Sequence, residues 1–227
     1  EMVPTVITAL QSIYWSGDVK GFEYREKIET LALYGTCEWF TDAQQSQMLD
    51  ILRSDILTAG HALQDEIGEV WMMSFIKAAW RERATYEDPR TSDKDYSRAR
   101  ALGAVLASGE RERLGMINNL QNMHWVACVV DIRQERVLYG DPFKKKPDSE
   151  TKEALSWWIT HHTGRTYTWD NLAVPSQMDG FNCGILSHIA LGHHFLPAVY
   201  PLINGTGNSP ADARLQMLLR IINRHLD

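Results

Sequence analysis

Apolar residues recur at helical spacing through most of the first half of the chain. Such spacing gathers them on one face of a helix, which is typical of helices that pack on a core. The stretch 6–33 carries this pattern with an interruption near residues 16–18, so it predicts two helices. Thr41 and Asp42 then provide a helix-start signal. Further helices are predicted over residues 43–57, 66–83 and 96–107, with a charged loop over 86–95.

The middle of the chain changes to a pattern typical of strands. Residues 125–132 are apolar and β-branched, residues 133–135 have the composition of a turn, and residues 136–139 return as a strand. This order predicts a β-hairpin. The other predicted elements are a short apolar run at 114–117, a strand at 166–169 and helices over 149–162, 183–195 and 211–226.

The predicted order of elements, with helices first, then strands and then helices again, favours a single α+β domain. The chain has 227 residues, of which 44% are hydrophobic and 23% charged, and this is ordinary for a globular protein with a sizeable core. It contains no apolar run of about 18 residues, and residues 1–4 lack the features of a signal peptide. We therefore expect no membrane association.

Charge and cysteine content narrow the expected partners and compartment. The formal net charge of −6 argues against nucleic acid as a partner. The three cysteines are too few and too widely spaced for a disulfide framework, so we expect a reducing compartment, the nucleus or the cytoplasm. We expect no metal and no other cofactor, because five clustered histidines fit no standard zinc-ligand spacing: His161, His162, His188, His193 and His194.

Four side chains together supply the groups that thiol catalysis requires. A thiol nucleophile needs a base, a group that orients the base, and donors for the oxyanion. Cys183, His124 and Asp141 fit the first three roles, and Gln177 fits the fourth. Each of them alone also has an ordinary explanation, such as a core cysteine at a helix start, a hairpin with polar ends, or a loop glutamine that contacts water.

The predicted elements place these residues within reach of one another. His124 begins one strand of the hairpin and Asp141 follows the other. Antiparallel pairing brings the start of one strand beside the end of the next, so Asp141 can bond one imidazole nitrogen and leave the other for Cys183. Cys183 begins a predicted helix, where the helix dipole and free N–H groups stabilise a thiolate and a developing oxyanion.

The same segments resemble the ubiquitin-like-protein proteases, the SUMO-deconjugating cysteine proteases of Ulp/SENP type. That family shows His-Trp before an apolar strand, Asp after a second strand, then Pro-x-Gln, a glycine-containing loop and Asp-Cys-Gly at the central helix. The resemblance covers about residues 35–196, and one departure is Asn182 in place of the usual aspartate. The matching segments are His124-Trp125, Asp141, Pro175-Ser176-Gln177 and Cys183-Gly184, with Trp39-Phe40-Thr41-Asp42 similar to an early tryptophan motif.

The resemblance implies an adenain-type, papain-like fold, in which a central mixed sheet is flanked by helices. It implies a catalytic domain over residues 35–227, preceded by a helical extension over residues 1–34. Trp39 and Trp125 would line a narrow tunnel that admits a Gly-Gly tail, because a slot between two indoles excludes a side chain at Cβ.

The resemblance also implies a role for each catalytic candidate. Cys183 would be the nucleophile, His124 the general base and acid, Asp141 the orienting carboxylate and Gln177 the oxyanion donor. The implied activity is that of a thiol isopeptidase that cleaves after the C-terminal Gly-Gly of SUMO or a related modifier, with the modifier and its conjugates as partners. We expect the enzyme to act as a monomer.

Three alternatives to this activity stay open. One is an acetyltransferase of the same clan, and another is a processing protease of the viral or mobile-element type. The third is a catalytically silent module that binds a modifier. The residues do not separate SUMO from ubiquitin or other modifiers, because modifier identity is read by a broad surface and not by the catalytic groups.

Overall fold

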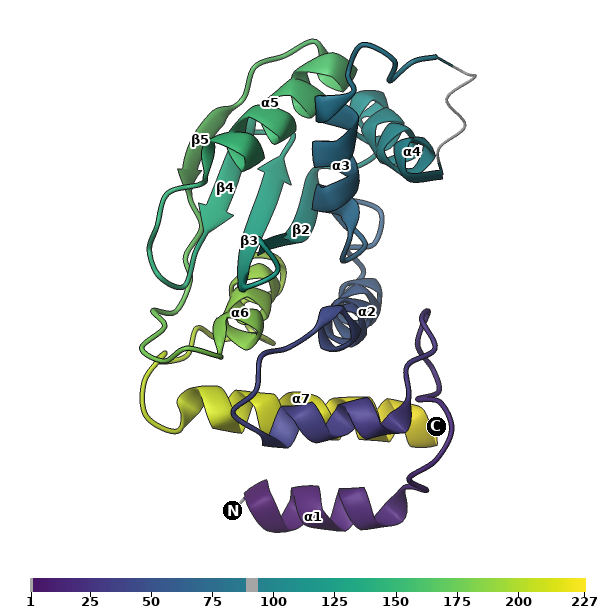
Figure 1. The fold of residues 1–227 in the computed structure, drawn as a ribbon, viewed down its shortest axis with the longest axis vertical. Helices are drawn as coiled ribbons and strands as arrows, with labels where there is room; N and C mark the ends of the chain where they lie inside the picture. The colour runs from purple at the N-terminus through teal and green to yellow at the C-terminus, as the bar shows by residue number, and fades with distance from the viewer. Residues whose placement is uncertain (1, 89–93) are drawn as a thin grey trace.

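A five-stranded mixed sheet forms the centre of residues 2–88 and 94–227, which the computed structural model describes (Figure 1). Its strands are β1 (Asp65–Ile67), β2 (Arg113–Leu120), β3 (His124–Asp131), β4 (Arg136–Gly140) and β5 (Thr168–Asn171). They lie side by side in chain order. The inner strands β2, β3 and β4 are antiparallel, while β1 and β5 run parallel to their neighbours at the two edges.

Helices cover both faces of the sheet and one end of the molecule (Figure 1). One face is covered by α3 (Met72–Arg81), α4 (Lys94–Ser108) and α5 (Ser149–Thr163). The other is covered by α6 (Cys183–Phe195), with α2 (Asp42–Thr58) beside it. At the far end, α7 (Ser209–Leu226) packs against α1 (Met2–Ser12) and the short 3-10 helix η1 (Ile28–Gly35).

Alternating side chains along the strands divide the core into two layers. Trp125, Ala127 and Val129 of β3 pack in the layer that contains α6, whereas Val130 packs in the layer below α3 and α5. Successive residues of a strand point to opposite faces, so a strand buried on both faces is apolar throughout. This explains the continuous apolar run of 125–132 from which the strand was predicted.

The predicted α+β class, the hairpin and most of the predicted helices are confirmed. The helix predicted over 43–57 is α2, and it begins with a capping box. Gln44 Oε1 accepts from the Thr41 backbone N–H at 3.0 Å, while the Thr41 hydroxyl accepts from the N–H of Ala43 at 3.3 Å. The helix predicted over 183–195 is α6, with the same bounds.

The single helix predicted over 66–83 is wrong at its start. Residues 65–67 form β1, and α3 begins only at Met72. β1 pairs in parallel with β2, and the Gly68 N–H donates to the Gly115 carbonyl at 2.9 Å. Pairing with a distant segment therefore overrides the local helical spacing. Of the loop predicted over 86–95, the last two residues belong to α4, and residues 89–93 lie outside the described part of the chain.

The two helices predicted over 6–33 are also only partly right. The first corresponds to α1, but the second is the 3-10 helix η1, which starts at Ile28. Gly17 and Gly21 between them have φ of 92° and 80°, in the left-handed region that interrupts a helix. Val6 and Ile28 belong to the same apolar cluster as α6. The division into residues 1–34 and 35–227 stays a prediction.

Gly115 of β2 offers a test of how closely α6 packs on the sheet. A Cβ at this position would lie 2.7 Å from Phe195 Cε2 and 2.9 Å from both Leu191 Cδ1 and Ile67 Cδ1. We expect Gly115→Ala to lower the free energy of unfolding by about 1–3 kcal/mol, because a packed core resists added volume. Urea unfolding measures this. Gly35→Ala is the control, since a Cβ there meets nothing within 4 Å, and equal stabilities of the two variants would refute the close packing.

Candidate active site

Cys183 is the first residue of α6, the helix that packs against β3. It is only 2% exposed, so its sulfur lies at the buried end of a surface hollow. Asn182 precedes the helix, but its side chain makes no capping hydrogen bond to the first turn. The N–H groups of that turn therefore remain available to a negatively charged sulfur or oxyanion, which the helix dipole also favours.

His124 and Asp141 meet across the ends of two paired strands. The register of β3 and β4 places Ala127 opposite Gly140, so the residue after β4 lies beside the start of β3. His124 Nε2 and Asp141 Oδ1 are 2.7 Å apart, and the Asp141 side chain is 1% exposed. This bond uses Nε2 and leaves Nδ1 as the ring nitrogen for the thiol of Cys183.

Phe143 stacks on the imidazole of His124. The two ring centroids are 4.7 Å apart and the rings are tilted by 19°. The Phe143 backbone N–H also donates to Asp141 Oδ1 at 2.7 Å, the same oxygen that bonds His124. One carboxylate oxygen therefore fixes both the imidazole and the ring that covers it, so the plane of His124 is held from its edge and from one face.

The surroundings of His124 favour its protonated form. Burial lowers the pKa of the imidazole, but hydrogen bonding to Asp141 and interaction with Cys183 outweigh burial and raise the pKa from 6.5 to about 9. The imidazolium is thus the stable form at neutral pH. A protonated imidazole beside a thiol stabilises the thiolate, which is the nucleophilic form of cysteine.

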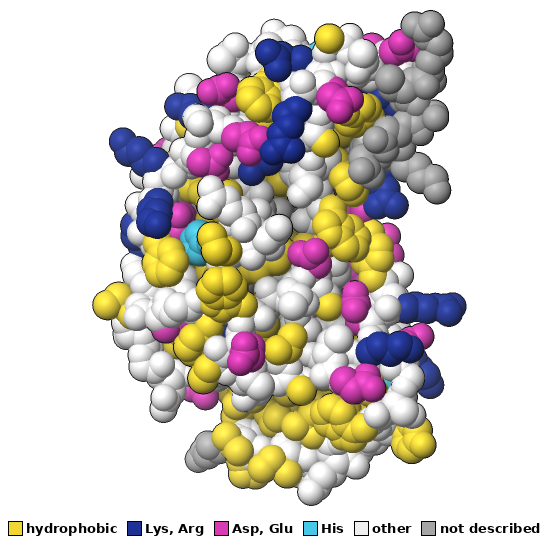
Figure 2. Space-filling model, in the orientation of Figure 1, with side chains coloured by type: hydrophobic (Ala, Val, Ile, Leu, Met, Phe, Trp, Pro, Cys, Tyr) yellow, Lys and Arg dark blue, Asp and Glu magenta, His cyan; other side chains and the backbone are white. Residues whose placement is uncertain are grey.

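Trp39 and Trp125 line a hollow of about 290 Å³ that also reaches Cys183. Trp125 is buried and donates its indole N–H to the Phe40 carbonyl at 2.8 Å. Trp39 is partly exposed and donates its indole N–H to the Gly180 carbonyl, in the loop before Cys183. Both indoles therefore border the approach to the sulfur. Figure 2 shows that hydrophobic side chains gather across the middle of one face of the molecule.

Gln177 lies in the loop before α6, and its side chain contacts Asp179. Its Nε2 is 2.8 Å from the Asp179 carbonyl and 3.3 Å from Asp179 Oδ1. Its backbone N–H donates to the Pro142 carbonyl at 2.8 Å, which ties this loop to the turn that carries Asp141. No hydrogen bond between Gln177 and Cys183 is formed in the described residues, so its role as an oxyanion donor stays a prediction.

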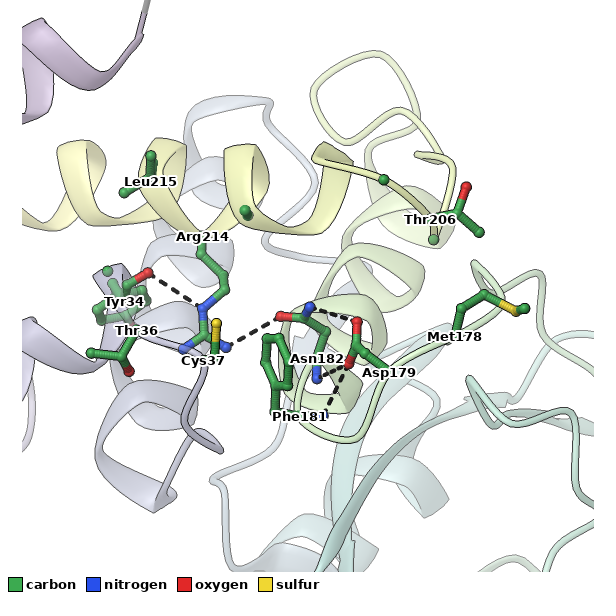
Figure 3. Close-up of a pocket in the computed structure, with 14 residues that line it drawn as sticks. Tyr34, Thr36, Cys37, Met178, Asp179, Phe181, Asn182, Thr206, Arg214 and Leu215 are labelled. Carbon is green, nitrogen blue, oxygen red and sulfur yellow. Dashed lines mark hydrogen bonds between the residues drawn. The ribbon is translucent and has the colours of Figure 1, made fainter.

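The loop before α6 also contacts α7 (Figure 3). Arg214 of α7 donates to Asn182 Oδ1 at 3.3 Å, and Asn182 Nδ2 donates to Asp179 Oδ2 at 2.8 Å. In Figure 3 these three side chains form a row between α7 and the loop. The residue before the candidate nucleophile is thereby anchored on both sides.

The other thiols and the histidine pairs lie in different environments. Cys128 is fully buried in β3, and burial raises the pKa of its thiol to about 12. Cys37 is exposed. In residues 2–88 and 94–227, no group of three or more His, Cys, Asp or Glu side chains is arranged to hold a metal ion. No helix in that part of the chain combines the length and apolar character needed to cross a membrane.

Comparison with solved structures identifies the fold. The yeast Ulp1 protease domain, solved in complex with Smt3, the yeast ortholog of SUMO, matches with a TM-score of 0.72 and 13% identity, over 100% of this chain and 96% of that one. The Chaetomium thermophilum Ulp1-like SUMO protease catalytic domain matches with a TM-score of 0.69 and 11% identity, over 98% and 88%. This chain has the Ulp1 protease fold.

A more distant match is the Xanthomonas campestris effector XopD bound to ubiquitin. It has a TM-score of 0.50 and 18% identity, over 81% of this chain and 91% of that one. No protein-family model and no curated protein sequence matches this chain. The chain therefore shares the Ulp1 fold with these structures at an identity too low for its sequence to match a family model or a curated protein.

Sequence reasoning missed two residues that the Ulp1 fold brings to the site. Phe143 had no signal, because a single aromatic residue in a polar loop predicts no contact with a histidine. Arg214 had one. It occupies a position in the helical stripe of α7 that is otherwise apolar and buried, formed by Pro210, Ala213, Met217, Leu218, Ile221 and Ile222. An arginine in such a stripe indicates a buried cation with specific partners.

The pKa of His124 can be measured without a substrate. An NMR titration of the imidazole should give a pKa near 9 in the wild type. Because this value lies above 6.5, the imidazolium stabilises the fold fully below pH 6.5, and this contribution is lost as the pH rises through 9. In Asp141→Asn, the opposing effect of burial should bring the pKa down towards 6.5 or lower.

The matched control for this titration is Asp170→Asn, which removes an exposed carboxylate of β5. It should leave the pKa of His124 where it is in the wild type. If the pKa stayed near 9 in Asp141→Asn, the hydrogen bond would not be the source of the shift.

Proposed function

We propose that the protein is a cysteine isopeptidase that cleaves after the C-terminal Gly-Gly of a ubiquitin-like modifier, with SUMO as the favoured one. The observation that carries the proposal is the placement of Cys183 at the start of α6, where it interacts with an imidazole bonded to Asp141 at 2.7 Å. These are the nucleophile, base and orienting group of thiol catalysis.

The proposed reaction runs in two halves. The Cys183 thiolate attacks the carbonyl carbon of the terminal glycine, and the carbonyl oxygen becomes an oxyanion beside the first turn of α6. The imidazolium of His124 gives its proton to the departing amine as the C–N bond breaks, which leaves a thioester on Cys183. Neutral His124 then takes a proton from water, and the hydroxide attacks the thioester and releases the modifier carboxylate.

Gln177 is the proposed side-chain donor to the oxyanion. Its amide Nε2 donates to the Asp179 carbonyl at 2.8 Å and makes a longer contact of 3.3 Å with Asp179 Oδ1. The longer contact is the weaker one, so the amide can exchange that contact for a hydrogen bond to an oxyanion while it keeps the bond to the Asp179 carbonyl. A neutral donor of this kind stabilises the transition state without adding charge.

The hollow beside Cys183 supports a glycine tail as the acyl group. Trp39 and Trp125 border it, and we expect two bulky indoles there to favour a backbone without side chains. Two proteins with a similar fold support a modifier as the substrate, since one was solved with Smt3 and the other with ubiquitin. Specificity for one modifier would reside in the surface around the hollow.

A panel of modifiers with a C-terminal electrophile tests the proposal. SUMO, ubiquitin and other modifiers, each ending in Gly-Gly and a reactive group, are incubated with the wild type, Cys183→Ala and Cys37→Ala. We expect an adduct with at least one modifier on the wild type and on Cys37→Ala, and none on Cys183→Ala, as seen by intact mass. Adduct formation on Cys183→Ala, or no adduct with any modifier, would count against the proposed function.

A further inference from the structure

Asp179 organises the loop before Cys183 through one carboxylate oxygen. Its Oδ1 accepts the backbone N–H of Phe181 and that of Asn182, both at 2.9 Å, and lies 3.3 Å from Gln177 Nε2. Burial acts to raise the pKa of this carboxyl, but the hydrogen bonds that it accepts hold the pKa below its usual range. The ionised carboxylate is therefore the form that shapes the loop.

Asn182 links this carboxylate to a buried cation. Its Nδ2 donates to Asp179 Oδ2 at 2.8 Å, and its Oδ1 accepts from Arg214 Nη1 at 3.3 Å. Asn182 is 4% exposed, so water cannot replace either partner. An amide is the side chain that this position requires, because it must donate on one side and accept on the other.

Arg214 carries a charge without a carboxylate beside it. It is 2% exposed, lies 4.0 Å from the centre of the Phe40 ring, and donates to the carbonyls of Leu33, Tyr34 and Glu38. Within the described residues, no carboxylate oxygen lies in ion-pair contact with it. Burial lowers the pKa of Arg214 to about 10, and the charge of Asp179 opposes that shift, so the guanidinium stays protonated at neutral pH.

We propose that Arg214, Asn182 and Asp179 form a positioning relay that fixes the amide of Gln177 and the backbone before Cys183. The catalytic effect of the relay rests on the proposed function, whereas the contacts that form the relay do not. The relay also accounts for the departure at position 182. An aspartate there would face the Asp179 carboxylate at the 2.8 Å contact that the amide of Asn182 now makes, so the acid at 179 requires an amide at 182.

Reciprocal substitution separates this relay from ordinary packing. In Asp179→Asn, two amide N–H2 groups would face each other, or Asn182 would turn an N–H2 group towards Arg214. In Asn182→Asp, two carboxylates would face each other. In the double variant D179N/N182D, the new amide at 179 still accepts the backbone N–H groups through its oxygen. Its N–H2 then donates to the new carboxylate at 182, which also accepts from Arg214.

The first arm of the experiment measures hydrogen exchange of the backbone amides of residues 181 and 182 in the full chain. It needs no substrate, so it decides the relay even if no modifier is cleaved. Each single substitution should speed exchange at both amides by roughly tenfold, because a buried polar contact is lost. The double variant should return both rates to within about threefold of the wild type. If the double variant exchanged as fast as the worse single variant, the relay would be overturned.

The second arm measures kcat and KM on a modifier with a fluorogenic C-terminal amide. Each single substitution should lower kcat by roughly tenfold with little change in KM, since an oxyanion donor acts in the transition state. The double variant should recover kcat. In a Gln177→Ala background, the single substitutions should lower kcat clearly less than they do in the wild type, because part of the effect of the relay acts through Gln177. Additive losses in that background would show that these residues do not act through Gln177.

Arg214→Met and Arg220→Met form a matched pair for the cation. Both arginines belong to α7, but Arg220 bonds Asp55 and Tyr200 instead of the loop. Both substitutions are expected to lower thermal stability. Only Arg214→Met should speed exchange at residues 181 and 182, and equal exchange in the two variants would exclude Arg214 from the relay.

Discussion

The hydrogen bond between His124 and Asp141 is the constraint on which the rest of the site depends. It joins the start of β3 to the residue after β4, so it exists only in the register that pairs Ala127 with Gly140. The turn that sets this register lies at the opposite end of the hairpin, where Glu135 adopts a positive φ of 49°. A slip of one residue would carry the imidazole away from its carboxylate.

Hydrogen bonds link this pair to the loop before Cys183 and to α7. Pro142 follows Asp141, and its carbonyl accepts the backbone N–H of Gln177 at 2.8 Å. The loop that starts at Gln177 leads to Cys183, and the far side of that loop reaches α7 through Arg214. Two strands, a loop and two helices therefore hold the candidate groups through buried polar contacts, which are stronger than the same contacts in water.

The central part of the fold could be predicted because its signals are local. A continuous apolar run on either side of a turn predicts the hairpin, and antiparallel pairing then predicts that His124 lies near Asp141. The apolar stretch after Cys183 likewise defined α6 with its bounds. The recognition of an Ulp-type pattern from these few segments is confirmed by the Ulp1 fold, although the identity to those structures is only 11–13%.

The parts that could not be predicted depend on partners far away in the sequence. β1 is a strand because β2 lies beside it, although its own residues continue a helical pattern. Phe143 covers His124 through a turn whose shape is fixed by hydrogen bonds to Asp141. Arg214 interrupts an apolar stripe, which is a signal in the sequence that was missed, and its partner Asn182 is 32 residues away in a loop with no regular structure.

The rate at which Cys183 reacts with iodoacetamide at pH 7, in the wild type and in Asp141→Asn, tests the central claim most directly. Cys37 is exposed in the same chain and serves as an internal reference, with both sites quantified by peptide mass spectrometry. If the hydrogen bond between His124 and Asp141 holds the imidazolium that activates Cys183, the substitution should slow the reaction of Cys183 by roughly tenfold and leave that of Cys37 unchanged. Equal rates at Cys183 in the two proteins would contradict the account.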